Sequence, residues 1–321
     1  MSTSLSSNID SSEEITPYAH FDLECQDLGV ACAKAKFRLD EKAPKAFKSA
    51  FVGFRGPKAF PSYFERKWLS LRLSAVKRGM VLDPEVDAAF LERITPRICP
   101  VTLEPFATDA KSQKNPSVDR LVNEGTYAAG NIGIFSIRAN RAKGAKTFEE
   151  VGALATAGSF RDGLEGVEWM RMATLMYGAW SMAIRGSDPY LLPLATYPGR
   201  AMFTSESQTI QLLLIRHCRD DVWPESMTVW KQATDDAGGS VERFMLFAQQ
   251  LKAAIQQEDY PPSAWLVPGV FDGFIDWYNE CRSSVCPLVQ TFREKYQAGI
   301  DSDDIVDKWS VGDRYVSGPL V

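Results

Sequence analysis

The chain has 321 residues and a formal net charge of −5, with 45% hydrophobic and 24% charged residues. This composition is ordinary for a globular protein, and the length indicates about two domains. No apolar run reaches the roughly 18 residues that a membrane helix needs, and the first residues lack the apolar core of a secretory signal. Six cysteines are scattered without a CxxC pair, so we expect free thiols, no membrane partner and a cytoplasmic location.

The N-terminal part is predicted to be a tail followed by loops and two helices. Residues 1–14 are polar and predict a disordered tail. Residues 34–61 contain Gly-Pro and Phe-Pro breaks, which indicate loops with short elements. Residues 62–80 predict an amphipathic helix, and a second helix is expected over 83–93, with the aspartate as its cap and the following proline at its first position.

A basic segment covers most of this part. Between Lys34 and Arg78 the chain carries thirteen Lys or Arg against three acids, with eight aromatic residues interleaved. Such a segment is either a solvated face with ordinary core aromatics or a contact surface for phosphates. The motif that follows it favours phosphates, with Lys77 and Arg78 as candidate contacts.

The next stretch predicts a strand, a turn, a second strand and a helix. Residues 117–122 alternate as a short strand, 123–125 are turn residues, and 132–137 form an apolar run, after which the composition favours a helix. This order brings Asp119 and Asn140 towards one another. A carboxylate and an amide oxygen suit a hard ion such as magnesium.

The same stretch resembles the HNH, or His-Me finger, nucleases of bacteria and phages. In that family a strand carries Asp-His, a loop Asn braces it, and the following helix supplies a final Asn or His. The resemblance covers about a sixth of the chain. It rests on these residues: Cys99-Pro100, Pro116-Ser117-Val118-Asp119-Arg120-Leu121, Tyr127, Gly130-Asn131, Ser136, Arg138-Ala139-Asn140 and Lys143.

The resemblance implies a ββα-metal core that binds one Mg²⁺ or Mn²⁺ ion and acts on DNA. Asp119 and Asn140 would be the metal ligands, and Asn131 would brace the loop. Arg120 would complete the catalytic group. Four further basic residues are candidate contacts to the nucleic-acid backbone: Arg138, Arg141, Lys143 and Lys146.

Two features depart from the family pattern. Arg120 stands at the position of the catalytic His, and a guanidinium stays charged at ordinary pH, so it cannot act as a general base. Many HNH proteins also carry two CxxC pairs that bind zinc. The matching positions here are Cys99, Thr102, Ser136 and Ala139. Because one sulfur cannot make a tetrahedral zinc site, we expect no structural zinc.

The identity of the general base stays open. The two histidines of the chain are His20 and His217, and the spacing places neither at the motif. A metal-bound hydroxide is one alternative, since a bound cation lowers the pKa of water. Asp109 or Tyr127 would then assist, and Arg120 would stabilise charge on the phosphate.

The second half is predicted to be a mainly helical domain. A helix is expected over 147–154, begun by a capping box of Thr147 and Glu150, and residues 158–166 are the candidate boundary. Met and aromatic residues at helical spacing indicate core rather than a cofactor site. Further helices are expected over 165–184, 205–218, 241–256 and 271–296, the last either continuous or broken near Pro287.

These elements predict an α+β protein with a small ββα core flanked by helices. The expected divisions are an HNH-like domain over 15–157, a helical domain over 158–300 and an acidic tail over 301–321. Three functions remain open: a metal-dependent DNA endonuclease or nickase, a degenerate HNH module that binds nucleic acid without cutting, and a structural or interaction protein that binds a protein partner through its helical half.

Overall fold

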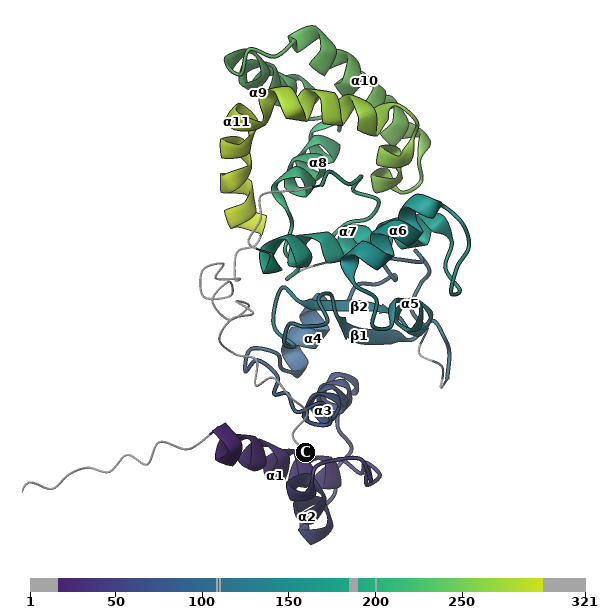
Figure 1. Cartoon of the computed structure of the whole chain (residues 1–321), viewed down its shortest axis with the longest axis vertical. Helices are drawn as coiled ribbons and strands as arrows, with labels where there is room; N and C mark the ends of the chain where they lie inside the picture. Colours follow the sequence, from purple (N-terminus) through teal and green to yellow (C-terminus); the bar gives the residue numbers. More distant parts are fainter. Residues whose placement is uncertain (1–16, 108, 110, 185–189, 200, 297–321) are drawn as a thin grey trace, which may run out of the picture. The chain divides into compact units, whose positions relative to one another are not determined.

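The computed structural model describes residues 17–107, 109, 111–184, 190–199 and 201–296 (Figure 1). The expected tails over 1–14 and 301–321 lie outside these ranges. The chain divides into two compact units after Leu82. No helix within the described ranges is long and apolar enough to cross a membrane.

The described part of the first unit is helical. Arg72 of the third helix has a side chain that is 9% exposed and pairs with Glu24 at 2.7 Å and Asp27 at 2.9 Å, both on the first helix. The third helix begins at a capping box of Ser62 and Glu65. The helices are α1 (Pro17–Lys34), α2 (Lys45–Gly53) and α3 (Tyr63–Val76). Their buried core contains Cys25, Leu28, Cys32, Phe47, Leu69 and Val76.

The second unit begins with a helix that starts later than predicted. Helix α4 spans Ala88–Ile94, and Asp87 caps it by accepting a hydrogen bond from the Phe90 amide at 2.6 Å. Asp83 instead accepts from the Glu85 amide at 3.0 Å. The predicted start at residue 83 was wrong because the aspartate closes a local turn rather than capping a helix.

The predicted hairpin and its helix are present. Strands β1 (Pro116–Arg120) and β2 (Ile132–Ser136) form a two-stranded antiparallel sheet. Helix α5 (Ile137–Lys143) follows β2 directly. Helices together with this small sheet confirm the α+β class.

The rest of the unit is helical, as predicted. Helix α6 begins at the predicted capping box, with Thr147 accepting from the Glu150 amide and Glu150 from the Thr147 amide. Helix α11 continues through Pro287, which decides between the two alternatives for this segment. The elements are α6 (Phe148–Ala157), α7 (Gly166–Ala183), α8 (Glu206–His217), α9 (Trp223–Asp236), α10 (Val241–Gln257), the 3-10 turn η1 (Pro261–Leu266) and α11 (Val270–Tyr296).

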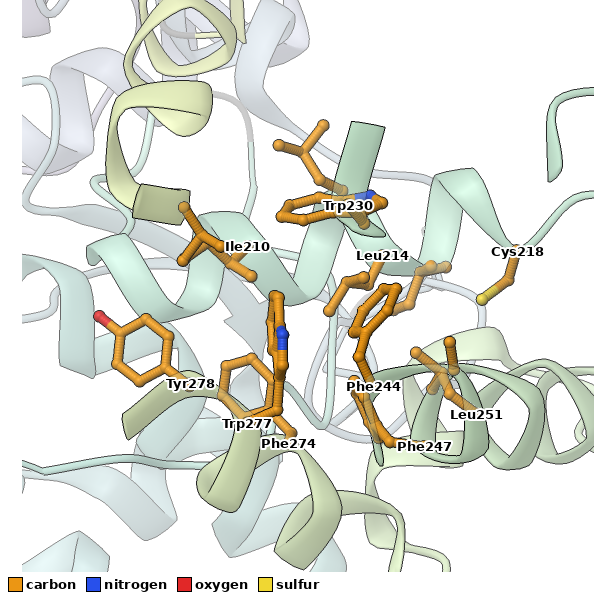
Figure 2. Packing of buried hydrophobic residues seen from close by; sticks show 14 of the residues in the cluster. Ile210, Leu214, Cys218, Trp230, Phe244, Phe247, Leu251, Phe274, Trp277 and Tyr278 are labelled. Carbon is orange, nitrogen blue, oxygen red and sulfur yellow. The ribbon is translucent and has the colours of Figure 1, made fainter. Parts of the chain in front are cut away.

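An aromatic core joins the last four helices. Figure 2 shows side chains of α8, α9, α10 and α11 meeting around Trp230, Phe244 and Trp277. The Trp277 ring centroid lies 5.7 Å from that of Trp230 and 5.0 Å from that of Phe244. The Met and aromatic residues of α7 are largely buried too, in agreement with their interpretation as core. A protein partner for this half stays a prediction.

The segment between α7 and α8 contacts the hairpin region. Thr196 donates a hydrogen bond to the Pro100 carbonyl at 2.8 Å, and the Gly130 amide donates to the Ala201 carbonyl at 2.7 Å. Gly130 has a φ of +88°, and an added Cβ would lie 2.2 Å from the Phe203 ring, so glycine is required here. The boundary that we expected at residue 158 therefore lies within a unit whose parts contact one another.

Candidate functional site

The hairpin and α5 place four polar side chains opposite one another. Ser117 and Asp119 are two residues apart on β1, so their side chains share one face of the strand. Asn140 and Lys143 are three residues apart on α5, so they share one face of the helix. The Asn140 amide donates to the Ser117 hydroxyl at 2.7 Å. The two expected metal ligands, Asp119 and Asn140, thus line the same interface between β1 and α5.

Lys143 supplies the main charge at this interface. Its side chain is 0% exposed, and its ammonium nitrogen lies 3.0 Å from Oδ2 of Asp119, whose side chain is 19% exposed. The ammonium also donates to Oδ1 of Asn123 at 3.0 Å. The Asn123 amide in turn donates to the carbonyls of Ala145 and Lys146, just past the end of α5. The buried lysine is therefore held between two side-chain oxygens, one of them anionic.

This pair bears on the expected metal ion. A divalent ion about 4 Å from the ammonium would be repelled by roughly 8 kcal/mol at an effective dielectric constant of about 20. Moving the lysine away would break its ion pair with Asp119 and its hydrogen bond to Asn123, and the ion would have to replace both contacts. As arranged, the residues around Asp119 do not fit a divalent ion. Within the described residues, no three His, Cys, Asp or Glu side chains gather as metal ligands either. Mg²⁺ or Mn²⁺ binding stays a prediction.

Asn131 lies at the base of the hairpin loop and holds it. This side chain is buried, and its Oδ1 accepts from the Val122 amide at 2.7 Å. Its Nδ2 donates to the carbonyls of Val122 at 3.0 Å and Thr126 at 2.9 Å. A Cβ on Gly125 would lie 2.5 Å from that nitrogen, so the loop needs glycine to pass this close. Asn131 thus fixes the turn that directly follows β1.

Arg120 follows Asp119 on β1 and, by strand alternation, lies on the other face. Its Nη1 donates to the Gly125 carbonyl at 3.1 Å, and its guanidinium carbon lies 5.0 Å from the centroid of the Tyr127 ring. These contacts fix the guanidinium beside the loop that Asn131 holds. A role for Arg120 towards a phosphate stays a prediction.

The candidate bases lie on different parts of the chain. His217 lies on α8, where its Nδ1 accepts from Nε1 of Trp230 at 2.8 Å. Burial, and to a lesser extent the charge of Arg216, lowers the pKa of His217. His20 lies on α1, in the other unit. Asp109 is exposed, and its backbone carbonyl accepts from the Asn115 side chain.

The residues expected to contact nucleic acid differ in their ion pairs within the protein and in their exposure. Arg138 is paired with Glu168 through two hydrogen bonds, and Lys77 of the first unit is paired with Asp40 at 2.6 Å. Arg78 and Arg141 are exposed.

A surface hollow lies along α5. Three basic residues line it together with Asp162, which pairs with Lys146 at 2.9 Å. Arg141 donates to Gln113 at 2.9 Å and extends into solvent. We call this the α5 hollow; its lining residues are Gln113, Arg138, Arg141, Ala142, Lys146 and Asp162.

Two of the positions that correspond to zinc ligands, Cys99 and Ser136, make hydrogen bonds within the chain. The Cys99 sulfur is buried and accepts from the Ser136 amide at 3.2 Å. The Ser136 hydroxyl accepts from the Ala139 amide at 3.2 Å and caps α5. Two of the four positions thus hold the start of the helix. The expected absence of zinc stays a prediction.

The sequence interpretation named Lys143 as a nucleic-acid contact and did not foresee its burial or its pairing with Asp119. A signal was available. The spacing of Asn140 and Lys143 on the predicted helix matches the spacing of Ser117 and Asp119 on the predicted strand. When these two faces pack together, Asn140 lies opposite Ser117 and Lys143 lies opposite Asp119, and the second pair is an ion pair. Asn123 was read as a turn residue, and its contact with Lys143 has no local signal.

Comparison with family models, with curated proteins and with solved structures finds no match to this chain. The HNH resemblance therefore rests on the motif residues and remains a prediction.

Proposed function

We propose that the β1–β2–α5 region is an HNH-like module that binds nucleic acid without cutting it. The observation that carries this proposal is the buried ion pair of Asp119 and Lys143, which sits where the family resemblance implies a metal ion. The Lys143 ammonium takes the place of a metal ion as the cation that pairs with Asp119, and so it stabilises the fold of the module. Unlike a metal ion, an ammonium does not bind a water molecule and lower its pKa.

The HNH part of the proposal is supported by the local arrangement. An antiparallel hairpin runs directly into a helix, and Asp119 and Asn140 line the same interface, where Asp119 contacts Lys143 and Asn140 contacts Ser117. Asn131 holds the loop through three hydrogen bonds. These are the relations that the motif implies for its acid, its bracing amide and its final amide.

The non-cutting part rests on charge and on proton transfer. Hydrolysis needs a group that accepts a proton from water, and Arg120 stays protonated. Lys143 already neutralises Asp119, and no step through a metal ion follows from this arrangement. Both features remove what the family uses for chemistry and leave its scaffold.

The nucleic-acid part rests on the α5 hollow. Arg138, Arg141 and Lys146 line it together with Asp162. Arg138 is paired with Glu168 and Lys146 with Asp162, whereas Arg141 is bonded to the neutral side chain of Gln113. Phosphates are positioned by such side chains, and each contact adds to the salt dependence of binding. Arg141 is exposed and is the residue that we assign to a phosphate, with Arg120 as a second candidate.

Binding is tested by fluorescence anisotropy on a labelled duplex across a range of salt concentrations. Arg141→Ala should weaken binding and reduce the slope of log affinity against log salt by about 1. Arg219→Ala is the matched control, because Arg219 is also exposed and lies between α8 and α9, away from the hollow. Equal losses in both variants, or no binding by the wild type, would refute the nucleic-acid part.

Cleavage is tested by incubating a supercoiled plasmid with Mg²⁺ or Mn²⁺. We expect no nicking by the wild type or by Asp119→Asn, which keeps the size of the side chain. If the wild type nicks the plasmid and Asp119→Asn does not, the proposal is overturned and the endonuclease function is favoured instead. That second candidate is favoured by one observation, the shared interface of Asp119 and Asn140.

A further inference from the structure

The first unit carries two large aromatic side chains on its surface. Phe60 is 77% exposed and Tyr63 is 51% exposed. Phe60 lies in the loop between α2 and α3, and Tyr63 is the first residue of α3. Isolated exposed aromatics are common, but here two lie three residues apart among cations. They define what we call the basic aromatic surface.

This surface is held in place by backbone contacts. The Ala59 amide donates to the Lys34 carbonyl at 2.9 Å, which fastens the loop to the end of α1. Arg66 of α3 donates to the Ala35 carbonyl at 3.3 Å. Phe60 is thus fixed between the end of α1 and the start of α3 rather than carried on an unattached loop.

Cations lie over the rings. The Lys36 ammonium is 3.6 Å from the centroid of Phe60, and the Lys67 ammonium is 5.4 Å from that of Tyr63. The Arg66 guanidinium carbon is 5.0 Å from the centroid of the Phe37 ring. The one acidic residue of α3, Glu65, accepts from the Ser62 amide in the capping box. Positive charge therefore dominates around the rings.

The charge of the whole unit agrees with this local arrangement. Residues 17–82 contain thirteen Lys and Arg against six Asp and Glu, whereas residues 83–321 contain twenty-three against thirty-two. Three of the six acids are already paired inside the unit, because Glu24 and Asp27 bind Arg72 and Asp40 binds Lys77. A negatively charged partner is favoured here, and the rest of the chain is acidic.

We infer that the basic aromatic surface, Phe60 and Tyr63 with Lys36, Arg66 and Lys67, binds single-stranded nucleic acid. Exposed rings offer faces on which unpaired bases stack, and the cations beside them reach the phosphates. A duplex keeps its bases inside its own stack and meets the cations alone. The inference rests on the proposed function for its class of ligand. It adds a second surface, on the other unit, with a preference for single strands.

The test is anisotropy of the full-length chain with labelled oligothymidine, the matching RNA strand and a duplex of equal length. Phe60→Ala should weaken single-strand binding about 5- to 100-fold, the loss of one stacking contact, and change duplex binding little. Phe60→Trp should keep the affinity, since its ring also stacks. Phe160→Ala is the matched control, because Phe160 is 62% exposed and lies in the second unit. The DNA and RNA strands show which nucleic acid is preferred.

The outcomes separate this inference from the proposed function. Loss of single-strand binding in Phe60→Ala, with no effect of Arg141→Ala on the duplex, supports the basic aromatic surface and refutes the α5 hollow. Equal single-strand affinity of wild type, Phe60→Ala and a Phe60→Ala/Tyr63→Ala double variant would overturn the inference. Sedimentation with phosphatidylserine vesicles that depends on Phe60, without oligonucleotide binding, would overturn it in favour of a membrane surface.

Discussion

Lys143 is the residue on which the interpretation of the site depends. A lysine that is fully buried is stable as a charged group only beside an anion and further acceptors. Asp119 and Asn123 provide both. The same residue that a motif comparison assigns to a phosphate is therefore internal. Arg141 on α5 and Lys146 just past its end are the basic side chains that reach solvent or the surface.

Replacing this lysine should both destabilise the module and create affinity for a divalent ion. Lys143→Met leaves Asp119 without its cation, so the free energy of unfolding should fall by about 3–5 kcal/mol in chemical denaturation. Added Mn²⁺ should then raise the melting temperature of Lys143→Met and leave that of the wild type unchanged, because binding to the folded state stabilises it. Lys146→Met is the control. Its pair with Asp162 is more exposed, so its loss should cost at most about 1 kcal/mol and give no response to Mn²⁺.

A melting temperature that rises with Mn²⁺ as much in the wild type as in Lys143→Met would contradict this prediction. It would mean that the ion binds beside the lysine or elsewhere.

At the scale of the elements, the sequence predicted those helix starts and strands that depend on residues close together in the chain. The predicted capping box of Thr147 and Glu150 is present, and the helices predicted to begin at residues 62 and 205 also start at capping boxes, which the prediction had not named. Helix α9 lacks such a signal, because its N-cap residue, Val222, makes no side-chain cap. Helices α1 and α9 were both missed. Alternation and an apolar run predicted the two strands, and the order of the elements predicted that α5 faces β1. The side chains that pair across this interface were not predicted, so the ion pair of Asp119 and Lys143 was missed.

Two glycines in the second unit should respond in opposite directions to alanine. Gly130→Ala places a methyl group against Phe203 at a positive φ, so the free energy of unfolding should fall by roughly 2–4 kcal/mol. Gly152 lies inside α6 with open space around it, so Gly152→Ala should stabilise by about 0.5–1 kcal/mol. Urea denaturation followed by circular dichroism measures both. A neutral Gly130→Ala would show that the segment around residue 203 gives way and does not brace the hairpin.

At the scale of the whole molecule, the chain is two compact units, each with its own buried core. We expect two transitions in differential scanning calorimetry. Leu28 and Leu251 are both 0% exposed, one in each core. Leu28→Ala should lower one transition and Leu251→Ala the other, each with a loss of about 2–5 kcal/mol. A single transition that both variants lower alike would show that the units unfold together.

The ion pair of Asp119 and Lys143 also bears on whether the fold of the module depends on ions in the surrounding solution. A cofactor ion can be diluted, dialysed or captured by a chelator, so the stability of a fold that needs the ion depends on the concentration of the free ion. Here the positive charge is tethered by a covalent backbone, so its local concentration is set by the chain itself. We therefore expect the hairpin and α5 to be equally well formed with added magnesium and with EDTA.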